Sequence, residues 1–145
     1  MKKILYSLLI FASATMFAQK NPNVKFVICN DAVGTAPVFN ANKAYVQSST
    51  VFKNKAALPS NLKKFDFLAD NGLTESRFKK DYGTLDIISL ATMNEQYDLP
   101  KETPVFIEGY EFSNTSTNIY ADIISNVEVK VIDGKKVLAI TTPIK

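Results

Sequence analysis

Histidine and tryptophan are absent from the 145-residue sequence, and cysteine occurs once. Without histidine, the Ser-His-Asp and Cys-His arrangements of nucleophilic catalysis cannot be built, and the usual general base with a pKa near neutrality is missing. Structural zinc sites and most catalytic zinc sites are excluded too, because their ligands are mainly histidine and cysteine. The five glycines are scattered, and none belongs to a G-x-G or G-x-x-x-x-G-K phosphate loop. We therefore expect no cofactor and no metal site.

The first 18 residues have the pattern of a bacterial signal peptide. Lys2 and Lys3 form a positive start, an apolar run follows, and small residues lead to Ala18. Cleavage after Ala18 leaves residues 19–145 as the mature domain, and cleavage after Ala14 is the alternative. The apolar run is shorter than the ~20 residues that a spanning helix needs, so an uncleaved anchor is the less favoured interpretation. We expect a secreted or periplasmic protein with no membrane span after cleavage.

The mature chain is close to neutral. The sequence has 17 Lys and Arg against 14 Asp and Glu, and loss of Lys2 and Lys3 leaves 15 against 14, a net charge of +1. Lysine pairs are scattered among acids, so the clustered basic surface that nucleic acids require is not expected. A mature chain of this length suits one domain with its own core. Cys29 ends an apolar run and is predicted to be a buried structural residue.

The pattern of apolar residues predicts one small α+β domain, with helices in the middle and a mostly antiparallel sheet. Strand-like runs cover 24–29, 44–52 and 105–107, with a loop over 30–43. No internal repeat is evident. Helices are expected to begin at three places that carry capping or starting residues, namely Pro59-Ser60, Thr74 and Thr84.

The clearest local signal is a C-terminal hairpin over Val127–Thr142. Three valines, at 127, 129 and 131, alternate with Glu128 and Lys130, and Asp133-Gly134 supplies a turn into a second apolar run. Alternation of this kind predicts that the valines face the core and that Glu128 and Lys130 face water.

Carboxylate chemistry survives the exclusions. Glycosidases place two carboxylates across a cleft, and the candidate pairs are Asp66 with Asp70 and Glu108 with Glu111. Neither pair lies in a defining motif, and acids at such spacings are usually solvated surface. Asp66, Asp70 and the following Asn-Gly also offer oxygen ligands for calcium, but the D-x-D-x-D-G pattern is absent and a helix stop explains them better. We therefore predict no catalytic residue.

Tyr110 and Phe112 lie in an aromatic-rich last third of the sequence. Most of these rings are expected in the core. If Tyr110 and Phe112 alternate outward, they form an aromatic contact patch on a strand edge, where a partner protein can bind by strand addition. These two residues are the binding residues that the sequence suggests.

Three short elements in the last third occur in a familiar order. Pro104 precedes an apolar triplet and an acid-glycine pair, an Ile-x-x-Val-Glu-Val element covers 124–129, and a glycine turn leads to an apolar strand ending in Thr141-Thr142. In this order, about residues 104–142 resemble the C-terminal part of the plug domain of TonB-dependent outer-membrane receptors. The family places an Ala and a Tyr-Gly segment between the last two elements, whereas here only a hairpin turn without such a segment connects Val129 to Val137. The resemblance implies a related small α+β fold in an envelope protein, and not transport.

Together these patterns predict an exported, non-enzymatic binding or interaction domain of the bacterial cell envelope. The expected partner is a protein or a small ligand of the envelope, and not nucleic acid. The alternative is a small secreted hydrolase that uses a carboxylate pair.

Overall fold

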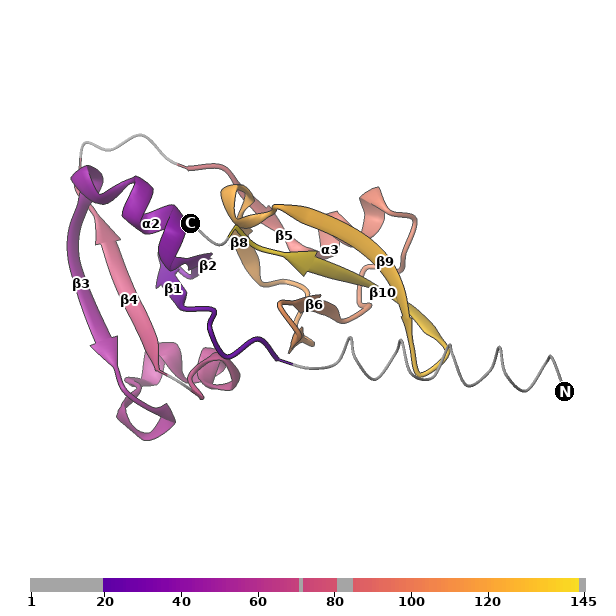
Figure 1. Cartoon of the computed structure of the whole chain (residues 1–145), viewed down its shortest axis with the longest axis horizontal. Coiled ribbons are helices and arrows are strands. Elements are labelled where there is room, and N and C mark those ends of the chain that lie inside the picture. Colours follow the sequence, from indigo (N-terminus) through magenta and orange to yellow (C-terminus); the bar gives the residue numbers. More distant parts are fainter. Residues whose placement is uncertain (1–19, 71, 81–84, 144–145) are drawn as a thin grey trace, which may run out of the picture.

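Two β-sheets lie side by side in the computed structural model, which describes residues 20–70, 72–80 and 85–143 (Figure 1). The predicted signal peptide and both of its candidate cleavage sites lie outside these residues. The first sheet has the strand order β3-β4-β1-β2-β8-β5 and the second has the order β7-β6-β10-β9. Five of the eight strand pairings are antiparallel, and β1–β4, β2–β8 and β6–β10 are parallel.

The strands of the first sheet are β1 (Phe26–Cys29), β2 (Ala32–Thr35), β3 (Val46–Phe52), β4 (Leu73–Phe78), β5 (Ile87–Ser89) and β8 (Asn118–Tyr120). Those of the second are β6 (Val105–Ile107), β7 (Tyr110–Phe112), β9 (Asn126–Ile132) and β10 (Lys135–Thr141). The helices are α2 (Ala36–Ala41), α3 (Leu90–Gln96) and the 3₁₀ segments η1 (Lys43–Tyr45), η2 (Lys55–Ala57), η3 (Ser60–Leu68) and η4 (Ala121–Ile123). The predicted α+β class is confirmed, although the strands form two sheets and not one.

Four strands of the first sheet repeat the arrangement of the second. In each set a tight hairpin, β1–β2 or β6–β7, pairs in parallel through its first strand with the second strand of an antiparallel pair, β3–β4 or β9–β10. Both tight turns, Asn30-Asp31 and Glu108-Gly109, have positive φ at both residues, as a type I′ turn requires. The repeat is therefore one of topology, and the sequence does not reveal it.

Aromatic rings join the two sheets in a common core. The ring of Phe26 on β1 packs edge-to-face against Tyr110 of β7 at 5.1 Å between centroids and against Phe112 at 6.3 Å. Phe67, from η3, contacts Phe112 at 5.0 Å. Such pairs stabilise beyond the apolar area that they bury. The core therefore crosses from one sheet to the other at β1 and β7.

Several local predictions are wrong. The segment after Thr74 is the strand β4 and not a helix, because it lies between β3 and β1 and pairs with both. The helix predicted from Thr84 begins instead at Leu90, where Ser89 caps it by accepting a hydrogen bond from the N–H of Thr92 at 3.1 Å. Residues 30–43, expected as a loop, contain β2 and α2. The helical segment after Pro59 is confirmed as a 3₁₀ segment with buried Leu62, Phe65 and Leu68.

The C-terminal hairpin is confirmed, but the predicted burial of its valines is wrong. Val129 and Val131 are 44% and 47% exposed, and Val127 is half-buried. The buried strand is β10, whose residues 137–140 are all buried between β6 and β9. β9 lies at the edge of the second sheet (Figure 1), so the core does not cover the whole of the sheet face on which its valines lie.

A candidate binding pocket between the two sheets

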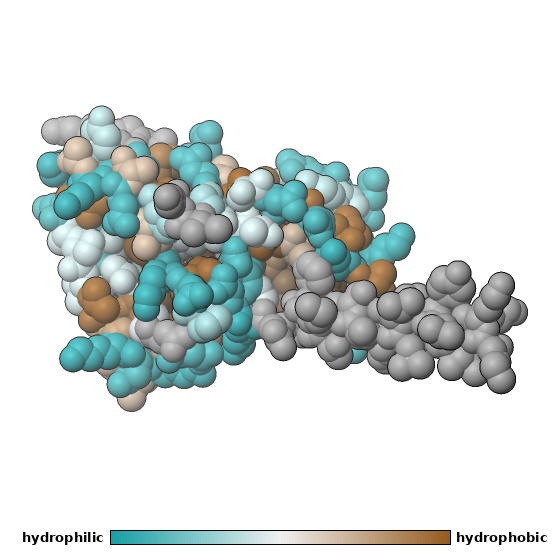
Figure 2. All heavy atoms as spheres, in the orientation of Figure 1, coloured by the Kyte–Doolittle hydropathy of each residue, from teal (hydrophilic) through white to brown (hydrophobic). Residues whose placement is uncertain are grey.

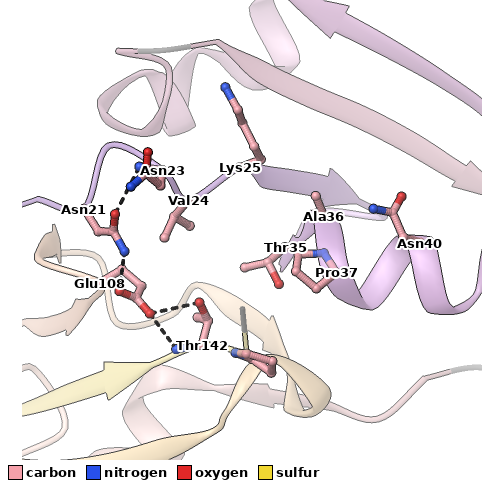
Figure 3. Close-up of a pocket in the computed structure, with 11 residues that line it drawn as sticks. Asn21, Asn23, Val24, Lys25, Thr35, Ala36, Pro37, Asn40, Glu108 and Thr142 are labelled. Carbon is pink, nitrogen blue, oxygen red and sulfur yellow. Dashed lines mark hydrogen bonds between the residues drawn. The ribbon is translucent and has the colours of Figure 1, made fainter. Parts of the chain in front are cut away.

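A pocket of about 280 Å³ opens where the two sheets meet (Figure 3). One wall comes from the segment that leads into β1 and from the junction of β2 with α2. The other comes from the β6–β7 turn and the end of β10. The residues that line it are Asn21, Asn23, Val24, Lys25, Thr35, Ala36, Pro37, Asn40, Glu108, Thr142 and Pro143. The pocket therefore needs the tertiary fold, because its walls come from both ends of the domain.

Glu108 is held in place in one wall of this pocket. Its Oε1 accepts hydrogen bonds from the backbone N–H of Thr142 at 2.8 Å and from the Thr142 hydroxyl at 3.0 Å. Its Oε2 accepts one from the side-chain amide of Asn21 at 3.1 Å. The backbone of Glu108 also takes part, since its N–H donates to Ile140 and its carbonyl accepts from Asn21. The carboxylate is thus held in one position before any ligand arrives.

Thr35 contributes a hydroxyl that has no partner among the described residues. The side chain is 1% exposed, and its Oγ1 makes no hydrogen bond. Thr35 precedes α2, where a threonine hydroxyl ordinarily accepts from the second or third N–H of the helix. Pro37 occupies the second position and has no N–H, and the hydroxyl does not bond elsewhere in the helix. An unpaired buried polar group is uncommon and calls for an explanation such as water or a ligand.

The rest of the pocket lining is small and polar. Among the described lining residues, Glu108 is the one acid, Lys25 is the one base, and no side chain is aromatic. Val24, Ala36 and the two prolines supply a limited apolar surface. The geometry therefore suits a small molecule with hydrogen-bond donors, since an ionised carboxylate only accepts and a hydroxyl can do both.

The suggested outward orientation of Tyr110 and Phe112 is wrong. β7 is an edge strand, as the aromatic-patch idea required, but the two rings are 3% and 1% exposed and point into the core. The alternation of β7 places Glu111 outside, because Phe26 and Phe67 fill the space beneath the two rings. These residues therefore form no exposed patch.

The candidate carboxylate pairs do not share a site. Glu108 lines the inter-sheet pocket, whereas Glu111 lines a separate hollow of about 800 Å³ on the outer face of the second sheet. Asp70 forms ion pairs with Lys20 at 3.0 Å and Lys55 at 3.2 Å, and these two ammonium groups lower its pKa. Asp66 is exposed and lines neither hollow. Across the described ranges, no three acidic or cysteine side chains come together to hold a metal ion.

Cys29 is buried, as predicted. It is completely inaccessible, and burial raises the pKa of its thiol. The Tyr120 hydroxyl donates to the backbone carbonyl of Cys29 at 2.9 Å, and burial raises the pKa of that phenol as well. Both groups are therefore held in their neutral forms within the core.

Thr35, Asn21 and Thr142 were not suggested by the sequence as site residues. A weak signal existed at Glu108, where an acid-glycine pair after an apolar triplet indicates a tight turn that brings a carboxylate to a strand end. Nothing local marks Thr142, which lies 34 residues further along the chain. The pairing of β10 with β6 is what brings the two together.

The described part of the chain contains no helix that is long and apolar enough to cross a membrane. No protein-family model matches the sequence, and no match was found among curated proteins or among solved structures.

Proposed function

We propose that this chain is an exported, non-enzymatic binding domain of the bacterial cell envelope, and that the inter-sheet pocket holds a small polar ligand. The observation that carries the proposal is that Thr35, whose buried hydroxyl has no hydrogen-bond partner among the described residues, lines the same pocket as the fixed carboxylate of Glu108. Leaving such a hydroxyl without a partner costs about 1–3 kcal/mol. A ligand that bonds to it recovers that free energy.

The ligand class follows from the polar atoms that line the pocket. Glu108 keeps acceptor capacity on Oε2, which receives one hydrogen bond, so an amine or hydroxyl of a ligand can bind there. Thr35 can then donate or accept, and Lys25 can donate to a ligand oxygen. The volume of about 280 Å³ lies near the lower limit for ligand sites, so the ligand is small.

The hydrolase alternative receives no support from this geometry. A hydrolase of the carboxylate-pair type needs two acids facing one substrate, and the described residues that line the inter-sheet pocket include one acid. The oxygens of that acid are already bonded to Thr142 and Asn21. Binding is the simpler use of a carboxylate held in this way. The resemblance of 104–142 to a plug domain agrees with an envelope location, but the pocket proposal does not rest on it.

The ligand part is tested by NMR titration of the ¹⁵N-labelled chain with glycine, ethanolamine and glucosamine, all of which carry donors. Benzoate, which has no donor, is the negative probe. At least one donor probe should give saturable shifts at amides around the pocket, such as Asn23, Ala36 and Thr142. Thr35→Val should weaken that binding about tenfold through loss of the hydroxyl, whereas Thr50→Val on the exposed strand β3 should not.

Either of two results overturns the pocket proposal. One is the absence of saturable shifts with every donor probe at about 10 mM, because a specific site should have a dissociation constant below that concentration for at least one of them. The other is binding that Thr35→Val leaves unchanged. The export part has its own test, because intact mass of the protein recovered from its native host should correspond to a chain that begins at Gln19 or Thr15. Retention of Met1 on the secreted species would contradict it.

A further inference from the structure

β9 is a long, regular sheet edge. Its seven residues pair with β10 without a register shift, and no strand pairs with its other side in the described part of the chain. The outer edge β3 of the first sheet is also seven residues long, but a register irregularity between Val46 and Ser48 interrupts it. Bulges of that kind protect an edge against further pairing. The edge strands β5 and β7 have three residues each. β9 is therefore the edge best suited to accept another strand.

The hairpin geometry fixes which backbone groups of β9 face outward. The N–H of Glu108 donates to the carbonyl of Ile140, so the backbone of Ile140 faces β6. Alternate residues face opposite sides of a strand, so the backbone of Ala139 faces its partner on β9, Glu128. The two-residue turn at Asp133-Gly134, which has positive φ at both positions, leads to the same assignment of the residues that bond across the hairpin. The outward N–H and C=O groups of β9 are therefore those of residues 127, 129 and 131.

The side chains at these positions are apolar and accessible. Val129 and Val131 are exposed on the sheet face that continues from buried Leu138. The opposite face carries Glu128 and Lys130, joined by an ion pair of 2.7 Å that lowers the pKa of Glu128. Natural edges are often protected by charges that repel a second strand, whereas these two are of opposite sign. In Figure 2, brown hydrophobic side chains interrupt the teal surface over the half of the molecule that holds the second sheet.

The sequence of β9 is complementary to itself. When two copies run antiparallel about a two-fold axis at Val129, Val129 lies opposite its equivalent and Val127 lies opposite Val131 of the second copy. Glu128 then lies opposite Lys130 of the second copy, and the reverse pair forms by symmetry. Each valine of one copy whose backbone faces outward therefore lies opposite such a valine of the other copy. An axis at Val127 or Val131 also matches the backbone groups, but leaves Glu128 and Lys130 without opposite charges.

We propose that β9 pairs with β9 of a second copy of this chain, antiparallel and centred on Val129, so that the two four-stranded sheets become one sheet of eight strands. The contact is isologous, as the commonest homodimers are. Cross-strand valine pairs and opposite charges each stabilise such a ladder modestly. This proposal is independent of the inter-sheet pocket, which lies at the β6–β7 turn and the end of β10 and is lined by none of these β9 residues.

The first experiment measures the mass of the purified chain by analytical ultracentrifugation over a range of concentrations. A reversible monomer–dimer equilibrium is expected. Val129→Lys places two ammonium groups opposite each other at the axis and should abolish the dimer. Val51→Lys, at an exposed position of the edge strand β3, is the matched control and should leave the dimer intact. A chain that stays monomeric up to about 1 mM overturns the proposal, because a specific dimer should form below that concentration. A dimer that Val129→Lys does not affect overturns it as well.

The second experiment tests the register. Glu128→Lys and Lys130→Glu each place like charges opposite one another, so each variant alone should dimerise about tenfold more weakly. A mixture of the two variants restores opposite charges across the interface, while repulsion within each chain persists. Recovery of the dimer in the mixture is therefore expected for intermolecular pairing about Val129. Failure of the mixture to dimerise better than either variant overturns the register.

Hydrogen exchange supplies a readout that does not depend on variants. The amides of residues 127, 129 and 131 should become protected as the concentration rises, whereas those of 128 and 130 are already bonded to β10 and should not change. Equal protection of all five amides at low concentration contradicts the assignment of outward groups.

Discussion

The carboxylate of Glu108 accepts two hydrogen bonds from Thr142, one from its backbone N–H at 2.8 Å and one from its hydroxyl at 3.0 Å. The two residues lie at the end of the β6–β10 pairing, and the side-chain amide of Asn21 donates a hydrogen bond to Oε2 of Glu108. A side chain at a tight turn thus connects the start of the described chain, the β6–β7 hairpin and the end of the last strand. This connection forms one wall of the inter-sheet pocket (Figure 3).

Replacement of Glu108 by alanine should lower the free energy of unfolding by about 2–3 kcal/mol, because the buried N–H and hydroxyl of Thr142 lose a charged acceptor. Glu108→Gln keeps an amide oxygen that can accept from Thr142 and should cost less than about 1 kcal/mol. Urea unfolding of both variants measures the difference. Equal losses would show that charge, and not hydrogen-bond acceptance, is what Glu108 contributes.

Replacement of Thr35 by valine should leave the ligand-free protein equally stable or make it more stable, by up to about 1 kcal/mol. Valine has the same shape, and the hydroxyl that it removes is buried and has no partner among the described residues. Thermal unfolding of the two proteins without added ligand is the measurement. A clear loss of stability would mean that the hydroxyl has a partner in solution, such as a bound water, and would contradict its role as a ligand contact.

Leu138 and Val129 form a cross-strand pair but should respond very differently to truncation. Leu138 is fully buried on the central strand β10, so Leu138→Ala should cost about 2–5 kcal/mol. Val129 lies on the edge strand and is substantially exposed, so Val129→Ala should cost less than about 1 kcal/mol. The urea midpoints of the two variants, measured on dilute protein, test this. Similar midpoints would place Val129 in the core, as the alternation of β9 alone predicts.

The Cys29 thiol should react slowly with a thiol reagent in the native protein and rapidly after unfolding. It is inaccessible, and its raised pKa lowers the fraction of reactive thiolate near neutral pH. Cys29→Ala should cost about 1 kcal/mol, since little volume is removed. Labelling kinetics with and without denaturant give the comparison. Equally fast labelling in both conditions would contradict the burial of β1.

Features that depend on a few neighbouring residues were determined by the sequence. Asp133-Gly134 tolerates the positive φ of a tight turn and is flanked by strand-forming residues, so the β9–β10 hairpin follows from local preferences. The apolar run that ends at Cys29 likewise predicts a buried strand, and β1 is one. The lack of histidine, and with it the exclusion of the Ser-His-Asp and Cys-His arrangements, follows from the sequence without any structure.

Only the tertiary structure decided which of two local preferences prevails and which distant groups meet. The segment at Leu73–Phe78 is a strand because β1 and β3 bond to it on both sides, and long-range pairing outweighs a weak helix preference. Tyr110 and Phe112 face inward because Phe26 lies beneath them, 84 and 86 residues away along the chain. The strand alternation of β9 sets which face its valines occupy, but its place at the sheet edge leaves that face exposed. The encounter of Glu108 with Thr142 follows from parallel pairing, which joins strands that are not adjacent in sequence and has no local signature.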